Sequence, residues 1–468
     1  MTMKTKLNFS TRYFLFCYAL LSLCTGSCKS FLDVDLPKSQ LISSTVFNDY
    51  ETATIAMTEV YSKLRDRGIL SGTSYGSSNL LGLYTDEMLS YRLQTDIVNY
   101  HFYNNSLLPT NTFVAEFWNL AYSQIYAANS VLEGVEASTG LSAEQKNKLS
   151  GEALFVRALL HFYLVNLYGD VPYIAQTDYK TNIVVTRIPT DNVYKLIIED
   201  LKKSIGLLPV SYTGSNKIIP NQSAAKALLS RVYLYQKSWP EAEEIASSLI
   251  NEATLFKFED NINNVFLISS KETIWQLQSA NAGQNAAEGA TFIFTSGPPA
   301  NTSLSLHLVN SFSNADLRKS NWIKAVTNGT SIWYHANKYK ERLSTTTSRE
   351  YSIIFRLSEQ YLIRAEARAQ QENLEGAQED INKIRGRAGL APTSASTKTD
   401  LLAAILQERR LELFTEHGHR FFDLKRNNQL DQALSGIKPG WNPTDRLFPI
   451  PEKELSTNPN LRPQNPGY

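Results

Sequence analysis

The chain has few cysteines, no excess of charge and no long apolar run. Its three cysteines, Cys17, Cys24 and Cys28, are too few among 468 residues for a disulfide scaffold. With 46 Lys and Arg against 45 Asp and Glu, the formal charge of +1 gives no overall field that would attract nucleic acid. A mean hydropathy of −0.27 excludes a polytopic membrane protein. HExxH, Walker, dinucleotide-binding and EF-hand motifs are absent, so we predict no metal site and no cofactor.

The N-terminus has the layout of a secretory signal. Basic residues precede an apolar run over residues 13–23, and the small residues 25–27 then lead to Cys28. This run is well short of the roughly 20 residues that span a bilayer as a helix. Cleavage before Cys28 would leave it as the first residue, the position that bacterial lipoproteins acylate. We therefore predict a lipoprotein signal peptide over residues 1–27 and lipidation of Cys28, with Cys24 as a rival site and a secreted soluble protein as the alternative.

Apolar residues at helical spacing predict helices through most of the remaining chain. Ser142 and Gln145 have the spacing of a capping box, and the helix that they open continues to the stop at Gly169 and Pro172. Such a helix would be roughly 40 Å long. Thr112 and Thr190 are the predicted caps of two further helices.

Two later segments each predict a helical hairpin. Arg231 lies in the first helix of one pair and Arg364 in the first helix of the other, and alanine recurs in both second helices. These hairpins resemble tetratricopeptide repeats, although the 34-residue period is not kept, so the likeness is architectural.

Between the two hairpins, about residues 254–356, the pattern changes to short β-like runs at 272–277, 291–294 and 351–355. Glycine, proline, asparagine and serine separate these runs. A long irregular segment with many aromatic residues predicts a functional region rather than a disordered one.

Three patterns suggest catalysis or metal binding, and each has a better structural explanation. Residues 72–76 match G-x-S-x-G, but a charged helix precedes them where a nucleophile elbow needs a buried strand. His417 and His419, two residues apart, do not share a helix face, and Gly418 predicts a C-terminal cap. Glu408 and Glu412 do share a face, where they can pair with arginines as part of a buttress that includes Arg409, Arg420 and Asp423.

Several sequence blocks occur in a fixed order. They are Cys28-Lys29-Ser30-Phe31-Leu32-Asp33, Gly151-Glu152-Ala153 with Arg157-Ala158, Tyr168-Gly169-Asp170-Val171-Pro172, and the segments 361–367, 382–390, 408–413, 420–426 and 464–468. Together they resemble the SusD/RagB family of outer-membrane lipoproteins from Bacteroidetes, from Cys28 to Tyr468. The resemblance implies a predominantly α, SusD-like fold with tetratricopeptide-like hairpins and an irregular, short-strand-containing region.

We expect residues 28–468 to form one SusD-like domain. Its parts would be an N-terminal loop and helix part (28–140), helical hairpins (141–253), an irregular ligand-facing region (254–356), and C-terminal hairpins with an extended tail (357–468).

The aromatic content, 6 Trp, 24 Tyr and 21 Phe, exceeds what a helical frame needs for its core. Aromatic rings cover the apolar face of a sugar at little entropic cost. In the family that this chain resembles, ligand-facing aromatics come from an N-terminal loop and from the segment before the last hairpins. The candidates from these regions are Tyr84, Tyr91, His101, Tyr103, Phe292, Phe294, Trp333 and Tyr334, and a core role is the alternative for each.

The resemblance implies a surface-exposed outer-membrane lipoprotein. It would bind a glycan or oligosaccharide and deliver it to a SusC-like TonB-dependent transporter, with no nucleic-acid partner and no catalysis. A peptide ligand of the RagB type is the alternative within the same class. A glycosidase, which would show two facing carboxylates about 5 to 10 Å apart, and a ligand-free scaffold are alternatives from other classes.

Overall fold

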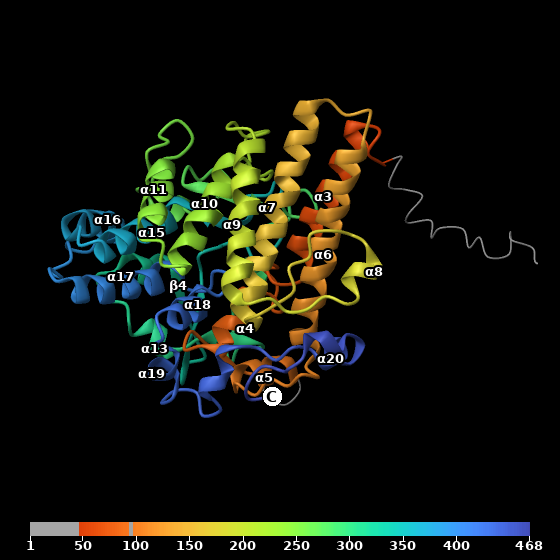
Figure 1. Cartoon of the computed structure of the whole chain (residues 1–468). Coiled ribbons are helices and arrows are strands. Elements are labelled where there is room, and N and C mark those ends of the chain that lie inside the picture. Colours follow the sequence, from red (N-terminus) through yellow and green to blue (C-terminus); the bar gives the residue numbers. More distant parts are fainter. Residues whose placement is uncertain (1–45, 93–96) are drawn as a thin grey trace, which may run out of the picture. The chain divides into compact units, whose positions relative to one another are not determined.

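The structure is a computed structural model that describes residues 46–92 and 97–468, and Phe47–Tyr468 form one compact unit. Long helices packed side by side make up its frame (Figure 1). They are α3 (Tyr50–Asp66), α6 (Thr112–Ala137), α7 (Ala143–Tyr168), α9 (Thr190–Leu207), α10 (Gln222–Tyr235), α11 (Trp239–Ile250), α15 (Leu357–Gln370), α16 (Leu374–Arg387) and α17 (Lys398–Leu413). The predicted predominantly α fold is confirmed.

Helix α7 is the central element of the frame and packs against α6 and α9. Ser142 and Gln145 form the predicted capping box, and Gly169 ends the helix at a φ of +76°. The helix is buried on all sides from Gly151 to Tyr168, as expected for a helix that runs through a core rather than over it.

The predicted helical hairpins are α10 with α11 and α15 with α16. Their two arginines serve the packing between helices. Arg231 pairs with Glu359 of α15 at 2.7 Å, and Arg364 pairs with Asp380 of α16 at 2.6 Å. One apolar cluster joins α15, α16 and α17, and it includes the side chains of Ala365, Ala377, Ile381 and Ile405.

The irregular region contains strands that pair two by two. Within the described residues, β1 (Met88–Ser90) pairs with β3 (Thr302–Leu304), β2 (Thr273–Leu277) with β6 (Ser352–Arg356), and β4 (Ile323–Thr327) with β5 (Ile332–Ala336), all antiparallel. Between them lie η2 (Ile262–Asn264), α12 (Ala287–Phe292), α13 (Leu306–Val309) and α14 (Leu317–Trp322). The strands predicted at 272–277 and 351–355 are confirmed. The strand predicted at 291–294 is wrong, because α12 continues to Phe292 and the Ile293 amide closes it on the Gly289 carbonyl.

Shorter helices complete the unit. They are α4 (Ser77–Tyr84), α5 (Ile97–Tyr103), α8 (Tyr179–Asn182), α18 (His419–Arg426), α19 (Leu430–Leu434), α20 (Glu452–Thr457), η3 (Pro443–Arg446) and η4 (Pro459–Leu461). Gly418 precedes α18 as its N-cap residue instead of capping the end of a helix, which corrects the prediction for that segment. Its φ is +79°, and a Cβ there would lie 2.2 Å from Leu81, so both backbone and space require glycine. The C-terminal tail packs across the end of α7, where the Asn465 amide donates to the Tyr168 carbonyl at 2.8 Å.

Candidate glycan-binding surface

Two segments that lie far apart in the sequence meet at the pair of β1 and β3. Directly after β1, the Tyr91 amide donates to the Asn301 carbonyl at 2.8 Å, and the Arg92 guanidinium donates to the Ala300 carbonyl at 3.0 Å. The Tyr91 ring is 37% exposed, and its hydroxyl lies 3.5 Å from that of Ser303. The loop before β3 therefore holds Tyr91 at the surface.

Trp333 on β5 contacts the same loop near its beginning, at Gly297. A Cβ on Gly297 would come within 2.2 Å of the Trp333 ring, so the absence of a side chain lets the loop lie close on the indole. Phe294 packs edge to face on His335, with ring centroids 5.1 Å apart. Trp333 and His335 share one face of β5, because alternate residues of a strand point the same way. Phe294 and Trp333 are both half-buried, so each presents part of its ring to solvent.

Helix α5 contributes further aromatic side chains. Tyr103 and Tyr91 are both candidate ligand-binding residues. Burial, and to a lesser extent the nearby Tyr91, raise the pKa of Tyr103. The Lys438 ammonium lies 3.9 Å from the centre of the Tyr103 ring, in a cation–π contact. His101 is half-buried, and its Nδ1 lies 3.0 Å from the Ser106 hydroxyl. We call Tyr91, His101, Tyr103, Phe294 and Trp333 the aromatic surface.

For two of the candidate residues, Tyr84 and Phe292, the predicted position at the surface is wrong. Tyr84 is fully buried, with its hydroxyl donating to the Asp445 carbonyl at 3.0 Å and its ring enclosed by other aromatic residues. Phe292 is only 5% exposed at the end of α12. Neither can contact a ligand. Tyr334 is half-buried but lies on the face of β5 opposite Trp333, so the two do not form one platform.

Two exposed tyrosines were not among the predicted residues. Tyr75, in the glycine-rich loop before α4, is 40% exposed and stacks on Phe113 with ring centroids 4.5 Å apart. Tyr100 on α5 is 38% exposed and packs edge to face on His101. Both tyrosines have polar neighbours in the sequence, which is a weak indication of a position at the surface.

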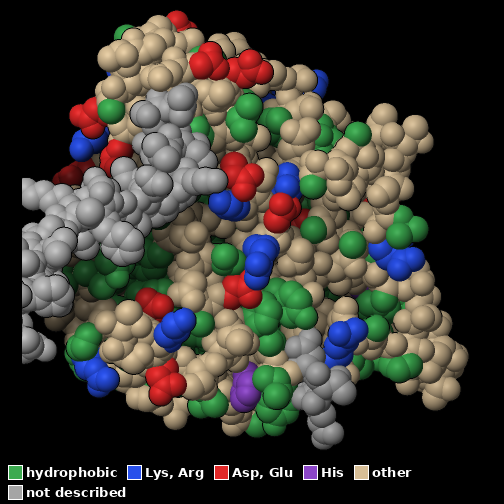
Figure 2. Space-filling model, turned by 90° about the vertical axis from the view of Figure 1, so that its right-hand side faces the viewer, with side chains coloured by type: hydrophobic (Ala, Val, Ile, Leu, Met, Phe, Trp, Pro, Cys, Tyr) green, Lys and Arg blue, Asp and Glu red, His purple; other side chains and the backbone are tan. Residues whose placement is uncertain are grey.

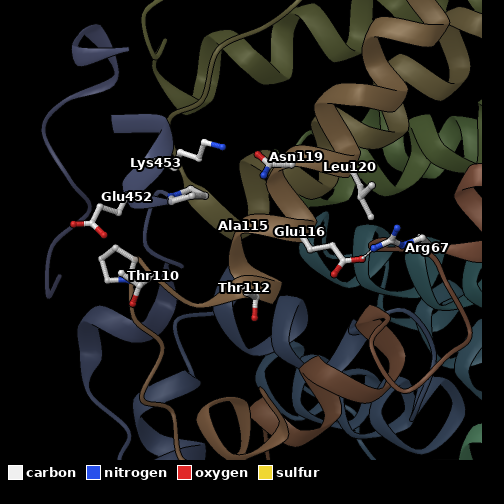
Figure 3. Close-up of a pocket in the computed structure, with 11 residues that line it drawn as sticks. Arg67, Thr110, Thr112, Ala115, Glu116, Asn119, Leu120, Glu452 and Lys453 are labelled. Atoms are coloured by element: carbon white, nitrogen blue, oxygen red, sulfur yellow. Dashed lines mark hydrogen bonds and ion pairs between the residues drawn. The ribbon is translucent and has the colours of Figure 1, made fainter. Parts of the chain in front are cut away.

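A pocket of about 540 Å³ lies between the start of α6 and α20 (Figure 3). Arg67 pairs with Glu116 at 2.9 Å on one side, and Asn119 and Lys453 extend toward each other across the pocket. Its lining comprises Arg67, Pro109, Thr110, Thr112, Ala115, Glu116, Asn119, Leu120, Pro451, Glu452 and Lys453, with no aromatic residue. None of the eight candidate ligand-binding residues lines this pocket.

Charges of both signs lie side by side near the centre of the face drawn in Figure 2. Lysine, arginine, aspartate and glutamate alternate across its centre, and hydrophobic side chains gather beside a histidine at its lower edge.

Glu408, Glu412 and Glu288 are buried carboxylates that contact partners within the fold. Glu408 and Glu412 pair with Arg318, which confirms their predicted role in a buttress. The predicted arginines Arg409 and Arg420 pair with Asp423 and Asp86. Burial raises the pKa of Glu288 to about 7, a value suited to a general acid, but this carboxyl faces a cavity of only about 10 Å³. Such a volume holds about one water molecule and no sugar.

The described residues show no membrane-spanning helix, since none is both long and apolar enough. In the same part of the chain, no three His, Cys, Asp or Glu side chains come together as metal ligands. Cys28 lies outside the described residues.

Two family models match the sequence. One, described as starch-binding associating with outer membrane, matches residues 30–234, and the other, described as SusD family, matches residues 313–468. The SusD-like protein P2 of Formosa agariphila is 28% identical over 426 residues, which cover 78% of this chain and 83% of that protein.

Solved structures share the fold. A SusD superfamily protein from Bacteroides vulgatus superposes with a TM-score of 0.76 at 22% identity, covering 90% of this chain and 100% of the other. A laminarin binding SusD-like protein gives a TM-score of 0.75 at 24% identity, covering 90% and 99%. A SusD-like model and a SusD family model together match most of the chain, which therefore belongs to the SusD/RagB family.

Proposed function

We propose that this protein binds a glycan or oligosaccharide at the aromatic surface. The observation that carries the proposal is the position of Tyr91 and Trp333, which contact one loop, residues 297–301, from two sides while presenting ring area to solvent. Rings held by backbone contacts lose little conformational freedom on binding. The laminarin binding relative and the starch-binding description of the family model support a carbohydrate ligand.

The protein would act as a lipoprotein of the outer membrane. Lipid on Cys28 would hold it at the membrane, since two or more acyl chains give stable anchoring. Bound ligand would pass to a SusC-like TonB-dependent transporter, and the protein itself would break no bond. Family membership supports both roles.

Substitution of the two rings should abolish most of the binding. We expect Tyr91→Ala and Trp333→Ala each to weaken binding at least about tenfold, or ~1.4 kcal/mol, because each removes stacking area. Calorimetric titration against a panel of polysaccharides, oligosaccharides and peptides measures this. Tyr179→Ala is the matched control, since Tyr179 is 71% exposed on α8, outside the aromatic surface.

If both variants bind the best glycan as the parent does, the site assignment fails. Saturable binding of peptides alone would favour the RagB-type alternative, and release of reducing ends by purified protein would show an enzyme. Trp333→Phe keeps a ring against Gly297, so the loop of residues 297–301 keeps its support. Comparing it with Trp333→Ala separates the loss of stacking area from the loss of that support.

The anchor is tested separately. We expect mass spectrometry of protein taken from its native membrane to find the chain starting at Cys28 with acyl groups attached. Cys28→Ser should release the protein from the membrane fraction, while Cys24→Ser should not. An unmodified Cys28 in native material would refute the anchoring proposal and leave the glycan proposal standing.

A further inference from the structure

A second large cavity, of about 560 Å³, lies where the end of α7, the start of α9, helix α18 and the C-terminal tail meet. No residue of the aromatic surface lines it. Its charged lining residues are Arg187, Lys425 and Arg462 against a single carboxylate, Asp170. The cavity is therefore cationic.

Lys425 has no counter-charge. Its ammonium donates to the Asn166 carbonyl at 2.5 Å, and Asn166 also lines the cavity. No carboxylate of the described residues lies within ion-pair distance of it. Burial and the positive charge of Arg446 lower the pKa of Lys425 to about 7. One carbonyl uses one of its three donors, so two remain.

The two arginines are in a similar state. Arg187 donates to the Asp170 and Pro463 carbonyls, both at 2.7 Å, and to the Asn465 amide oxygen at 2.6 Å. These neutral oxygens orient its guanidinium without neutralising it. Arg462, on the exposed tail, has no side-chain partner among the residues that the structure describes.

Asp170 is the one carboxylate that offsets part of this charge, through its attraction to Arg187. One of its carboxylate oxygens accepts from the amide and the hydroxyl of Thr190, at 2.8 and 2.9 Å, and so caps the start of α9. The positive end of that helix dipole adds to the cationic character of the cavity. Burying the Lys425 ammonium without a counter-charge is costly, so an anion that enters the cavity would gain its attraction.

We propose that this cavity binds an oxyanion, a carboxylate or sulfate group carried by a small polar molecule. Lys425 and Arg462 would contact the anion directly, and Arg187 would hold the tail in place and add its charge. Guanidinium and ammonium donors suit such oxygens. The volume is in the range of about 300 to 1,000 Å³ typical of small-molecule sites and exceeds what a single inorganic ion needs. The proposal does not depend on the aromatic surface.

Calorimetric titration of the whole protein with sodium sulfate and with sodium glucuronate tests this, at an ionic strength held constant with sodium chloride. We expect saturable binding that Lys425→Met and Arg462→Met each weaken about tenfold or more. Lys203→Met removes the same charge from the exposed far end of α9 and should leave binding as in the parent. Arg462→Met keeps the test valid if Lys425→Met does not fold.

The pH dependence gives a second readout. Because Lys425 loses its proton near pH 7, the affinity of the parent should fall as the pH rises from about 6 to 8.5, whereas Lys425→Arg should keep its affinity. Tighter binding of glucuronate would assign the anion to an acidic sugar, and tighter binding of sulfate to a free inorganic anion or a sulfate ester. Absence of saturable binding for both, or equal losses in Lys203→Met and Lys425→Met, would overturn the proposal.

Discussion

Replacing Glu412 with glutamine should cost ~3–5 kcal/mol of folding free energy, a large share of the ~5–15 kcal/mol that stabilises a typical domain. The Glu412 carboxylate lies 2.6 Å from Arg356 and 3.3 Å from Arg318, and it also pairs with Arg387. All four side chains are buried. Glutamine has nearly the same shape but no charge, so the loss reports three guanidinium groups left without their shared anion.

Urea denaturation at neutral pH measures this loss, with Glu372→Gln as control. Glu372 pairs with Lys398 at 2.9 Å, but its side chain is 68% exposed, so that change should cost less than ~1 kcal/mol. Equal losses in the two variants would refute the role of the network.

The same network sets the response to acid. Burial alone would raise the pKa of Glu412, but Arg387, Arg356 and Arg318 outweigh it and hold the pKa well below its usual value. A carboxylate with a lowered pKa stabilises the fold above its unfolded pKa of about 4.3 and loses that contribution as the pH falls further. The difference between parent and Glu412→Gln should therefore shrink below about pH 4.

The sequence predicts one half of this network and not the other. The spacing of Glu408 and Glu412 places both on one helix face, and that prediction is confirmed. Their partners Arg318 and Arg356 come from distant segments, α14 and the end of β6. Arg387, in the last turn of α16, is buried against Glu272 and Glu412. Charge spacing along one helix defines a face but not the element that packs on it.

Helix starts show a similar limit on a smaller scale. The predicted capping box at Ser142 is confirmed, because both of its partners are local. The predicted cap Thr112 is wrong by one residue, since the Asn111 side chain accepts from the amides two and three residues later. Thr190 begins α9 but does not cap it. The Thr190 amide donates instead to the carboxylate of Asp170, 20 residues earlier in the chain. A cap supplied by tertiary structure leaves no pattern in the local sequence.

The sequence locates segments rich in aromatic residues but does not tell which of these residues are exposed. Tyr84 and Tyr91 stand seven residues apart, yet one is core and the other surface, because α4 is buried on all sides and the chain emerges only after β1. Phe292 and Phe294 differ for a related reason, since a short helix occupies the predicted strand. Composition indicates that aromatic residues gather in a segment, whereas the phase of each element decides which of them reach solvent.

Glu152→Gln should stabilise the protein above neutral pH. Glu152 lies on α7, is 3% exposed, and accepts a hydrogen bond from the Tyr61 hydroxyl at 2.6 Å. Burial raises its pKa to about 7, while the Tyr61 hydrogen bond and Lys148 lower it less. A carboxyl with a raised pKa contributes fully below its unfolded pKa of about 4.3, and that contribution is lost as the pH rises through about 7. Glutamine resembles the neutral form and can still accept the Tyr61 hydroxyl, so it avoids this loss.

We expect the variant to exceed the parent by ~2–3 kcal/mol at about pH 8 and to differ little at about pH 5, as urea denaturation at both values would show. Glu199→Gln removes an exposed carboxylate from α9 and should change stability little at either pH, which separates burial from net charge. Glu87 and Glu288, whose pKa values burial also raises to about 7, remain in both proteins, so some decline above pH 5 should persist in the variant. A variant that is less stable than the parent at pH 8 would mean that the fold favours the Glu152 anion, because Tyr61 and Lys148 would then outweigh the cost of its burial.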